Sequence, residues 1–296
     1  MSDAVSTGEP GPAAEGLRAA ATQALSWLEA TLLGVVEGLT EFLPVSSTGH
    51  LIVTQRALGL EEGPATNAFA IGIQLGAITA VLVLYWRRLW AAASTVARPE
   101  PGRPNLLWQI GIAAVPAVVV GLLFEDWIDE HLFSARVVAA TLVGGGVLLL
   151  WLERHLRDRP PRTEEFSQMT YRVALWIGLW QCLALVPGTS RSGATIGGAL
   201  MHGVSRTAAA EFSFLVGLPI LYGASFWKLY KARELLTGDM VAPFAVGTGV
   251  SFVAALLVVR PFVAFLRRHD FVPFAWYRIV AGGALLALIE AGYLGS

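Results

Sequence analysis

The chain has 296 residues, of which 55% are hydrophobic and only 15% are charged, and its mean hydropathy is +0.59. In soluble domains about a quarter of all residues are charged, so this composition excludes an ordinary water-soluble enzyme. A disordered chain needs few apolar residues and a high net charge, and a nucleic-acid binder needs a basic surface. The formal net charge of -1 excludes both, and a bilayer is the expected solvent.

Residues 1–20 are rich in Gly, Pro, Ala and acids, which predicts a flexible N-terminal tail rather than a signal peptide with its basic start. Beyond the tail, six apolar runs reach the roughly 20 residues that a membrane-spanning helix requires. Charged or Pro/Gly-rich loops bound each run. The predicted spans are 68–86, 105–124, 134–152, 208–227, 240–259 and 274–294.

Two further apolar stretches, 24–60 and 173–204, are interrupted near the middle by a proline and small polar residues. The first break follows Pro44 and the second follows Pro187. Proline disfavours a helical conformation in the preceding residue, and Ser and Thr are good helix N-caps, so each stretch is predicted to form helix, break and helix. The half-helices are short, which favours two re-entrant hairpins. Non-helical backbone at membrane depth is tolerated only beside protein or a wet cavity.

The two breaks also match each other. Pro44 matches Pro187 at a spacing of 143 residues, and Phe69 matches Phe212 at the same spacing. This indicates one membrane domain, 21–296, made of a repeat over about 21–155 and another over about 170–296. Three spans lie between the hairpins, so the second hairpin must enter from the opposite face. The predicted fold class is an all-α integral membrane protein with an inverted-topology repeat, two re-entrant helix hairpins and six transmembrane helices.

Positive charge predicts the orientation in the membrane. The loops 87–104, 153–172 and 260–278 hold thirteen arginines, against six basic residues on the other side when the second hairpin is left out. Because cytoplasmic loops are enriched in Lys and Arg, these loops are expected in the cytoplasm. Both termini and the acidic loop 125–130 are then expected outside, and the first hairpin enters from outside.

Ionisable residues are costly at membrane depth and indicate function there. Glu37 and Glu41 are four residues apart on a predicted helix, so both carboxylates project from one face just before Pro44. Two anions this close must share a proton, a cation or an arginine. The structural alternative is a pair satisfied by a neighbouring span.

The second half-helices are predicted to begin at Ser46-Ser47-Thr48 and at Ser190-Arg191-Ser192. A helix N-terminus attracts phosphate, although simple helix capping also explains the serines. The planar fork of Arg191 suits a phosphate or a structural pair with either glutamate. His50 could act as general acid or base, or position a serine. Together these groups suit phosphoryl transfer: carboxylates for a divalent cation or for activating the nucleophile, a hydroxyl or water to attack, an acid, and positive charge.

At these residues the sequence strongly resembles the bacterial undecaprenyl-diphosphate phosphatase family, also known as the bacitracin-resistance proteins. The first motif is the segment EGLTEFLPVSSTGH at 37–50, and the second is PGTSRSGAT at 187–195. Further family-like segments are 74–77, 211–215 and 277–278, and the resemblance runs from about residue 22 to the C-terminus. Only the acidic, proline-containing tail departs from the family pattern.

The resemblance implies hydrolysis of undecaprenyl diphosphate, a polyprenyl diphosphate lipid, to undecaprenyl phosphate and inorganic phosphate. This reaction recycles the lipid carrier for peptidoglycan synthesis and confers bacitracin resistance. It implies a multi-pass protein of the bacterial plasma (inner) membrane, a site open to the periplasm, and a need for Mg²⁺ or Ca²⁺. Carried over by position, Glu37 and Glu41 hold the cation or act as base. Ser47 rather than Ser46 is the nucleophile or a phosphate ligand. His50 is the acid or base, and Arg191 clamps the diphosphate. Phosphate is further supported by Ser46, Ser190, Ser192 and Thr195.

Several alternatives stay open at this point. Inverted repeats with broken helices are typical of secondary transporters, so the same groups could carry or flip a lipid phosphate or another phosphorylated anion. Attack by serine and attack by water are both compatible with the motif. The expected partners are the lipid substrate and membrane lipid, with no nucleic acid, and a homodimer is left open.

Overall fold

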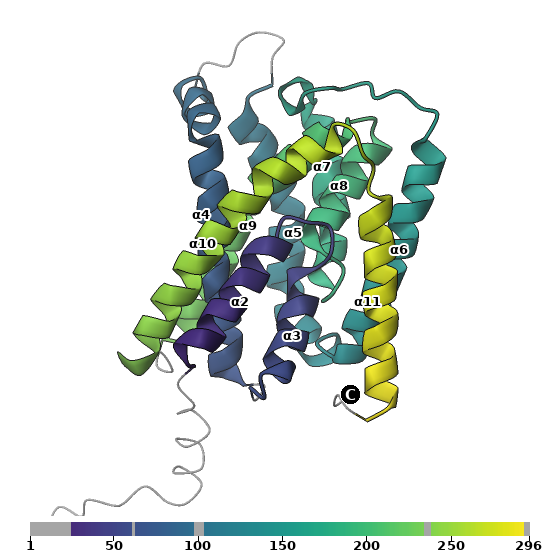
Figure 1. The fold of residues 1–296 in the computed structure, drawn as a ribbon. Helices are drawn as coiled ribbons and strands as arrows, with labels where there is room; N and C mark the ends of the chain where they lie inside the picture. Colours follow the sequence, from purple (N-terminus) through teal and green to yellow (C-terminus); the bar gives the residue numbers. More distant parts are fainter. Residues whose placement is uncertain (1–24, 61–62, 98–103, 234–237, 293–296) are drawn as a thin grey trace, which may run out of the picture.

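The computed structural model describes residues 25–60, 63–97, 104–233 and 238–292, so the predicted tail 1–20 lies outside the described residues. The described part is helical throughout (Figure 1). Its first half contains α2 (Trp27–Thr40), α3 (Ser47–Ala57), α4 (Pro64–Ser94), α5 (Leu106–His131) and α6 (Ala135–Leu156). Its second half contains the short 3-10 helices η1 (Phe166–Gln168) and η2 (Cys182–Leu185) and the helices α7 (Tyr171–Gln181), α8 (Arg191–Met201), α9 (Arg206–Lys231), α10 (Gly238–Leu266) and α11 (Val272–Glu290).

Six helices in the described residues are long and apolar enough to cross a membrane, and each overlaps one of the six predicted spans. They are α4, α5, α6, α9, α10 and α11. Several boundaries differ from the prediction. The acidic segment 125–130 continues α5 instead of forming a loop, and α4 and α10 run past their predicted ends at 86 and 259 to Ser94 and Leu266. Asn105 caps the start of α5, and the helix runs on to His131 before its C-cap at Leu132.

Both predicted breaks are present. The helix α2 begins with a capping box between Ser26 and Glu29 and ends just before Glu41. The backbone then turns sharply, and Ser46 precedes α3 with φ 71°, in the left-handed region. Ser190 precedes α8 in the same way with φ 74°, and these two are the positive-φ non-glycine residues of the described part. Such a conformation is strained for a residue with a side chain and is common at functional sites.

The two caps are 144 residues apart, one more than the spacing that the prolines give. One residue, Val45, separates Pro44 from its cap, whereas Gly188 and Thr189 separate Pro187 from Ser190. The positions that open the second half-helices are therefore Ser47 in one half of the chain and Arg191 in the other.

The short helices lie against long ones in a matching way. The helix α2 packs along α10, and α7 packs along α5. Gly34 of α2 lies so close to the carbonyl oxygen of Gly247 in α10 that a Cβ would come within 2.5 Å of it. Gly178 of α7 lies equally tightly against the carbonyl oxygen of Ala113 in α5. Small residues at such crossings let helix backbones approach closely inside a membrane.

Arg278 holds the two breaks together. Its side chain is fully buried, and it donates to the carbonyl oxygens of Pro44 at 3.2 Å, of Gly188 at 3.3 Å and of Thr189 at 2.9 Å. It also donates to the carbonyl oxygen of Thr141 in α6 at 3.0 Å. The prediction that Arg278 belongs to a cytoplasmic loop is therefore wrong, because it lies inside α11. Its guanidinium satisfies backbone carbonyls that the breaks leave without helical partners.

We expect Arg278→Lys to lower the free energy of unfolding by roughly 2–4 kcal/mol, because an ammonium cannot reach all these carbonyls and several would be left buried and unpaired. The measurement is the thermal unfolding temperature of the purified protein in detergent. Arg268→Lys, at an exposed position in the turn between α10 and α11, is the matched control and should melt like the wild type. Equal melting of both variants would contradict this role of Arg278.

Candidate active site

An ion pair joins the two breaks. Arg191 Nη2, from the second break, donates to Glu41 Oε1, from the first, at 2.9 Å. The other carboxylate oxygen of Glu41 accepts from the hydroxyl of Ser47 at 2.6 Å. The side chains of Arg191 and Glu41 are only 10% and 5% exposed. A base, a hydroxyl and a guanidinium predicted from distant parts of the sequence thus meet in one buried cluster.

The guanidinium of Arg191 has a second support. Its Nη1 donates to the carbonyl oxygen of Ser213 in α9 at 2.6 Å, and its Cζ lies 6.0 Å from the centre of the Phe42 ring. Its Nε is buried with no hydrogen-bond partner among the described residues. The fork is therefore held in place from two sides and keeps donor capacity that an anion could use.

Further hydrogen bonds connect the breaks beside this ion pair. Ser192 donates to the carbonyl oxygen of Leu43 at 2.8 Å, and its hydroxyl lies 3.0 Å from that of Ser190. Ser190 in turn accepts from the backbone N–H of Gly193 at 3.1 Å and so caps α8. Thr195 donates to the hydroxyl of Ser213 at 2.7 Å. Ser192 and Thr195 therefore join elements around the site.

A cavity of about 180 Å³ lies at this junction. Five of the predicted site residues line it, namely Glu41, Ser46, Ser47, Ser190 and Arg191. The other four, Glu37, His50, Ser192 and Thr195, are outside its lining. The helices α3 and α8 both begin at the wall of this cavity. Their first-turn N–H groups and the Arg191 guanidinium can donate hydrogen bonds to an anion bound there.

Glu37 lies one helical turn before Glu41. It is fully buried, and neither of its carboxylate oxygens has a hydrogen-bond partner in the described part of the chain. A buried carboxyl group without a partner is costly unless a proton or a cation accompanies it. Glu37, one helical turn from the cavity-lining Glu41, is therefore a carboxyl group that needs a bound proton or a cation.

His50 points elsewhere. Its Nδ1 lies 2.7 Å from the carbonyl oxygen of Ser46 and its Nε2 lies 2.6 Å from the hydroxyl of Tyr277. It lines a separate cavity of about 260 Å³ with residues of α3, α6 and α11. Nδ1 thus supports the strained turn at Ser46, and Nε2 is occupied by Tyr277 of α11. This favours the positioning alternative for this histidine.

Two glutamines were missed as site residues. Gln74 of α4 and Gln181 of α7 line the same cavity, and Gln181 is almost fully buried, with Nε2 3.3 Å from the carbonyl oxygen of Ala113. Its Oε1 has no partner within the described ranges. A polar amide inside an apolar stretch was the available indication in each case.

The described residues hold no group of three or more His, Cys, Asp or Glu side chains that could enclose a metal ion. This does not exclude Mg²⁺, which uses one or two carboxylates together with water and substrate phosphates. Glu41 at the cavity wall and the unpartnered oxygens of Glu37 behind it fit that smaller requirement.

The chain is similar to known proteins over most of its length. The family model described as bacitracin resistance protein BacA matches residues 30–284. The chain is 49% identical over 265 residues to undecaprenyl-diphosphatase 2 of Rhodospirillum rubrum, covering 90% of this chain and 96% of that protein. It is 44% identical over 269 residues to undecaprenyl-diphosphatase 1 of Acinetobacter baylyi, covering 90% and 97%. The chain therefore belongs to the bacitracin resistance protein BacA family.

Proposed function

We propose that this protein hydrolyses undecaprenyl diphosphate to undecaprenyl phosphate and inorganic phosphate, and so recycles the lipid carrier of peptidoglycan synthesis and confers bacitracin resistance. The observation that carries the proposal is the contact of the buried Glu41 carboxylate with both Ser47 and Arg191 at the wall of one cavity. The relatives that share most of the chain's length are named undecaprenyl-diphosphatases, which favours hydrolysis over transport.

Ser47 and Glu41 form a nucleophile and base at hydrogen-bond distance, 2.6 Å. The Ser47 oxygen attacks the terminal phosphorus while Glu41 accepts its proton. The bond from that phosphorus to the bridging oxygen breaks, and undecaprenyl phosphate leaves with the bonding electrons. Water then hydrolyses the phosphoserine, which releases inorganic phosphate and restores the hydroxyl.

Arg191 and the two helix N-termini stabilise the charge that develops on the phosphate oxygens. With Nη1 still on the Ser213 carbonyl oxygen, Arg191 transfers its Nη2 hydrogen bond from Glu41 to the diphosphate, which frees Glu41 to act as base. Ser46 and Ser190 line the cavity and add hydroxyl contacts, whereas Ser192 and Thr195 support the phosphate indirectly by holding the breaks together.

Glu37 and Glu41 are the residues that would hold a divalent cation, Mg²⁺ or Ca²⁺, together with the diphosphate. When bound, such a cation would neutralise phosphate charge and act as a Lewis acid. The support for this assignment is the pair of unpartnered oxygens on the fully buried Glu37.

The hairpins α2–α3 and α7–α8 are proposed to be re-entrant and related by an inverted repeat. Three observations support this relation. The helix α2 packs on α10 as α7 packs on α5, α4 packs on its equivalent α9 and α6 on its equivalent α11, and Ser46 and Ser190 are equivalent strained caps. Each half-helix has 11 to 14 residues, which is too short to span a bilayer alone.

The site is proposed to open to the periplasm, where both termini also lie. A second cavity, of about 600 Å³, shares Thr48 and Gln74 with the active-site cavity and extends to Phe133, Lys228 and Lys231. These residues lie at the end of the molecule opposite the arginine-rich loops, and removing Arg278 from the charge count leaves that asymmetry in place. A diphosphate could therefore enter from the outer face of the bacterial inner membrane.

Glu41→Gln and Arg191→Lys should each lower phosphate release from undecaprenyl diphosphate by at least about 100-fold, because they remove the base and the bidentate fork. The measurement is phosphate release by the purified protein in detergent with added Mg²⁺ or Ca²⁺. Glu290→Gln and Arg136→Lys change the same residue types in an exposed ion pair and should keep wild-type activity. Full activity in both site variants would refute the proposed function.

His50→Asn should retain activity within about tenfold, because an asparagine amide can still donate to the Ser46 carbonyl oxygen and keep the turn in place. The pH profile of kcat should also keep its shape. A general acid or base typically contributes 10²–10⁴-fold, so a loss of that size together with the disappearance of one limb of the profile would show that His50 transfers a proton instead.

A further inference from the structure

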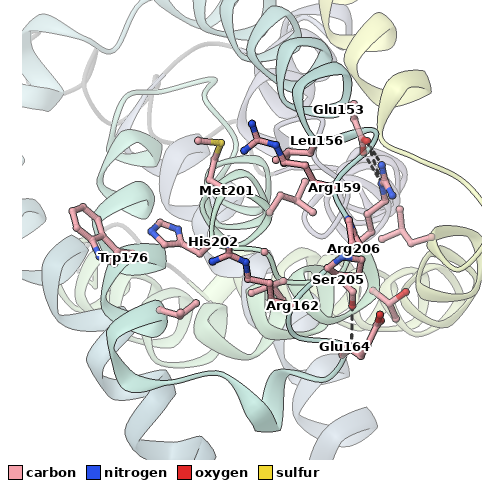
Figure 2. Close-up of a pocket in the computed structure, with 18 of the residues that line it drawn as sticks. Glu153, Leu156, Arg159, Arg162, Glu164, Trp176, Met201, His202, Ser205 and Arg206 are labelled. Carbon is pink, nitrogen blue, oxygen red and sulfur yellow. Dashed lines mark hydrogen bonds and ion pairs between the residues drawn. The ribbon is translucent and has the colours of Figure 1, made fainter.

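A second large cavity lies away from the active site. It has a volume of about 1140 Å³ and shares no lining residue with the active-site cavity. Its walls come from the end of α6, the segment that leads to α7, the turn between α8 and α9, and the end of α10. Figure 2 shows Glu153 and Arg206 at one side of it, Trp176 and His202 at the other, and Arg159 and Arg162 between them.

The cavity is built on fixed backbone. The N–H of Arg162 donates to the carbonyl oxygen of Gly203 at 2.7 Å, and the N–H of Ser205 donates to the carbonyl oxygen of Thr163 at 2.9 Å. The hydroxyl of Ser205 donates to the carbonyl oxygen of Glu164 at 3.0 Å. The segment between α6 and α7 is thus attached to the turn between α8 and α9, which keeps the cavity open between two anchored walls.

Its charge is predominantly positive. Arg206 is bound by Glu153 in an ion pair, so these two cancel. Two acids, Asp158 and Glu164, then face a larger set of arginines in the lining: Arg159, Arg162, Arg172 and Arg267. The helix α9 also starts at this wall, and its 26 residues direct the positive end of their dipole toward it. Both features attract an anion with phosphate-like geometry.

One side of the cavity is apolar. Trp176 is 42% exposed and stacks on His202, with ring centres 5.6 Å apart. Met201, beside it in the lining, is 38% exposed. An exposed tryptophan and methionine next to arginines, at the end of a membrane-spanning bundle, match the boundary between acyl chains and headgroups. A soluble anion would gain nothing from this apolar side.

We propose that this cavity binds the phosphate headgroup of an anionic phospholipid, with the arginines on the phosphate and an acyl chain along Trp176 and Met201. Basic pockets at the ends of membrane helices are suited to such headgroups. The site differs from the active site in place and in ligand, and it needs no hydrolysis.

The test is native mass spectrometry of the full-length protein in neutral detergent, titrated with dioleoyl phosphatidylglycerol or with dioleoyl phosphatidylcholine. We expect retention of one phosphatidylglycerol and at least tenfold weaker binding of phosphatidylcholine. The variant Arg159→Gln/Arg162→Gln/Arg172→Gln should weaken phosphatidylglycerol binding roughly 100-fold.

The matched control is Arg154→Gln/Arg157→Gln/Arg268→Gln, which removes three exposed arginines of the same end from outside the lining. It should keep phosphatidylglycerol affinity within about fivefold, and both triple variants should keep the wild-type unfolding temperature in lipid-free detergent. Equal weakening by both triples, or equal binding of the two lipids, would overturn the proposal. Displacement of phosphatidylglycerol by millimolar inorganic phosphate would overturn it too, because the cavity would then be a site for a soluble anion.

Discussion

The ion pair between Glu41 and Arg191 is the interaction on which the rest of this structure depends. It joins the two interrupted segments over 150 residues of sequence, and it is nearly removed from solvent. Taking two charges out of water is costly, and a buried pair of this kind is weak evidence for stability. Removing one partner leaves the other charge buried and alone. The pair is therefore better explained by the proposed function than by stability. It places Arg191 where an anion can bind, and Ser47 is already hydrogen-bonded to the Glu41 carboxylate.

The breaks themselves carry a second cost, which the surrounding helices offset. A break leaves backbone N–H and C=O groups without helical partners inside the protein, where each needs another hydrogen-bond partner. Arg278 donates to carbonyl oxygens of both breaks, and Ser192 donates to that of Leu43. In addition, Ser46 and Ser190 both hold a left-handed backbone conformation. Strain and unusual hydrogen bonding are thus concentrated where the proposed chemistry takes place.

Much of this arrangement could be predicted from the sequence, because the bilayer imposes simple rules. Apolar length predicted the six spans, proline predicted the two breaks, and the cost of charge in lipid indicated Glu37, Glu41 and Arg191. The rest depended on tertiary contacts. Arg278 was counted as a loop residue, since nothing in its sequence neighbourhood shows that α11 turns it toward the breaks. The same applies to His50, whose partner Tyr277 is distant in sequence and drawn in by folding.

The claim that the two breaks form a single catalytic unit has one direct test. Phosphate release from undecaprenyl diphosphate would be measured for Glu41→Gln, Arg191→Lys and the variant that carries both. Groups that act as a unit are strongly non-additive, so the double variant should be within about tenfold of the less active single variant. Losses that multiply in the double variant would show that the two residues act independently and would contradict the account.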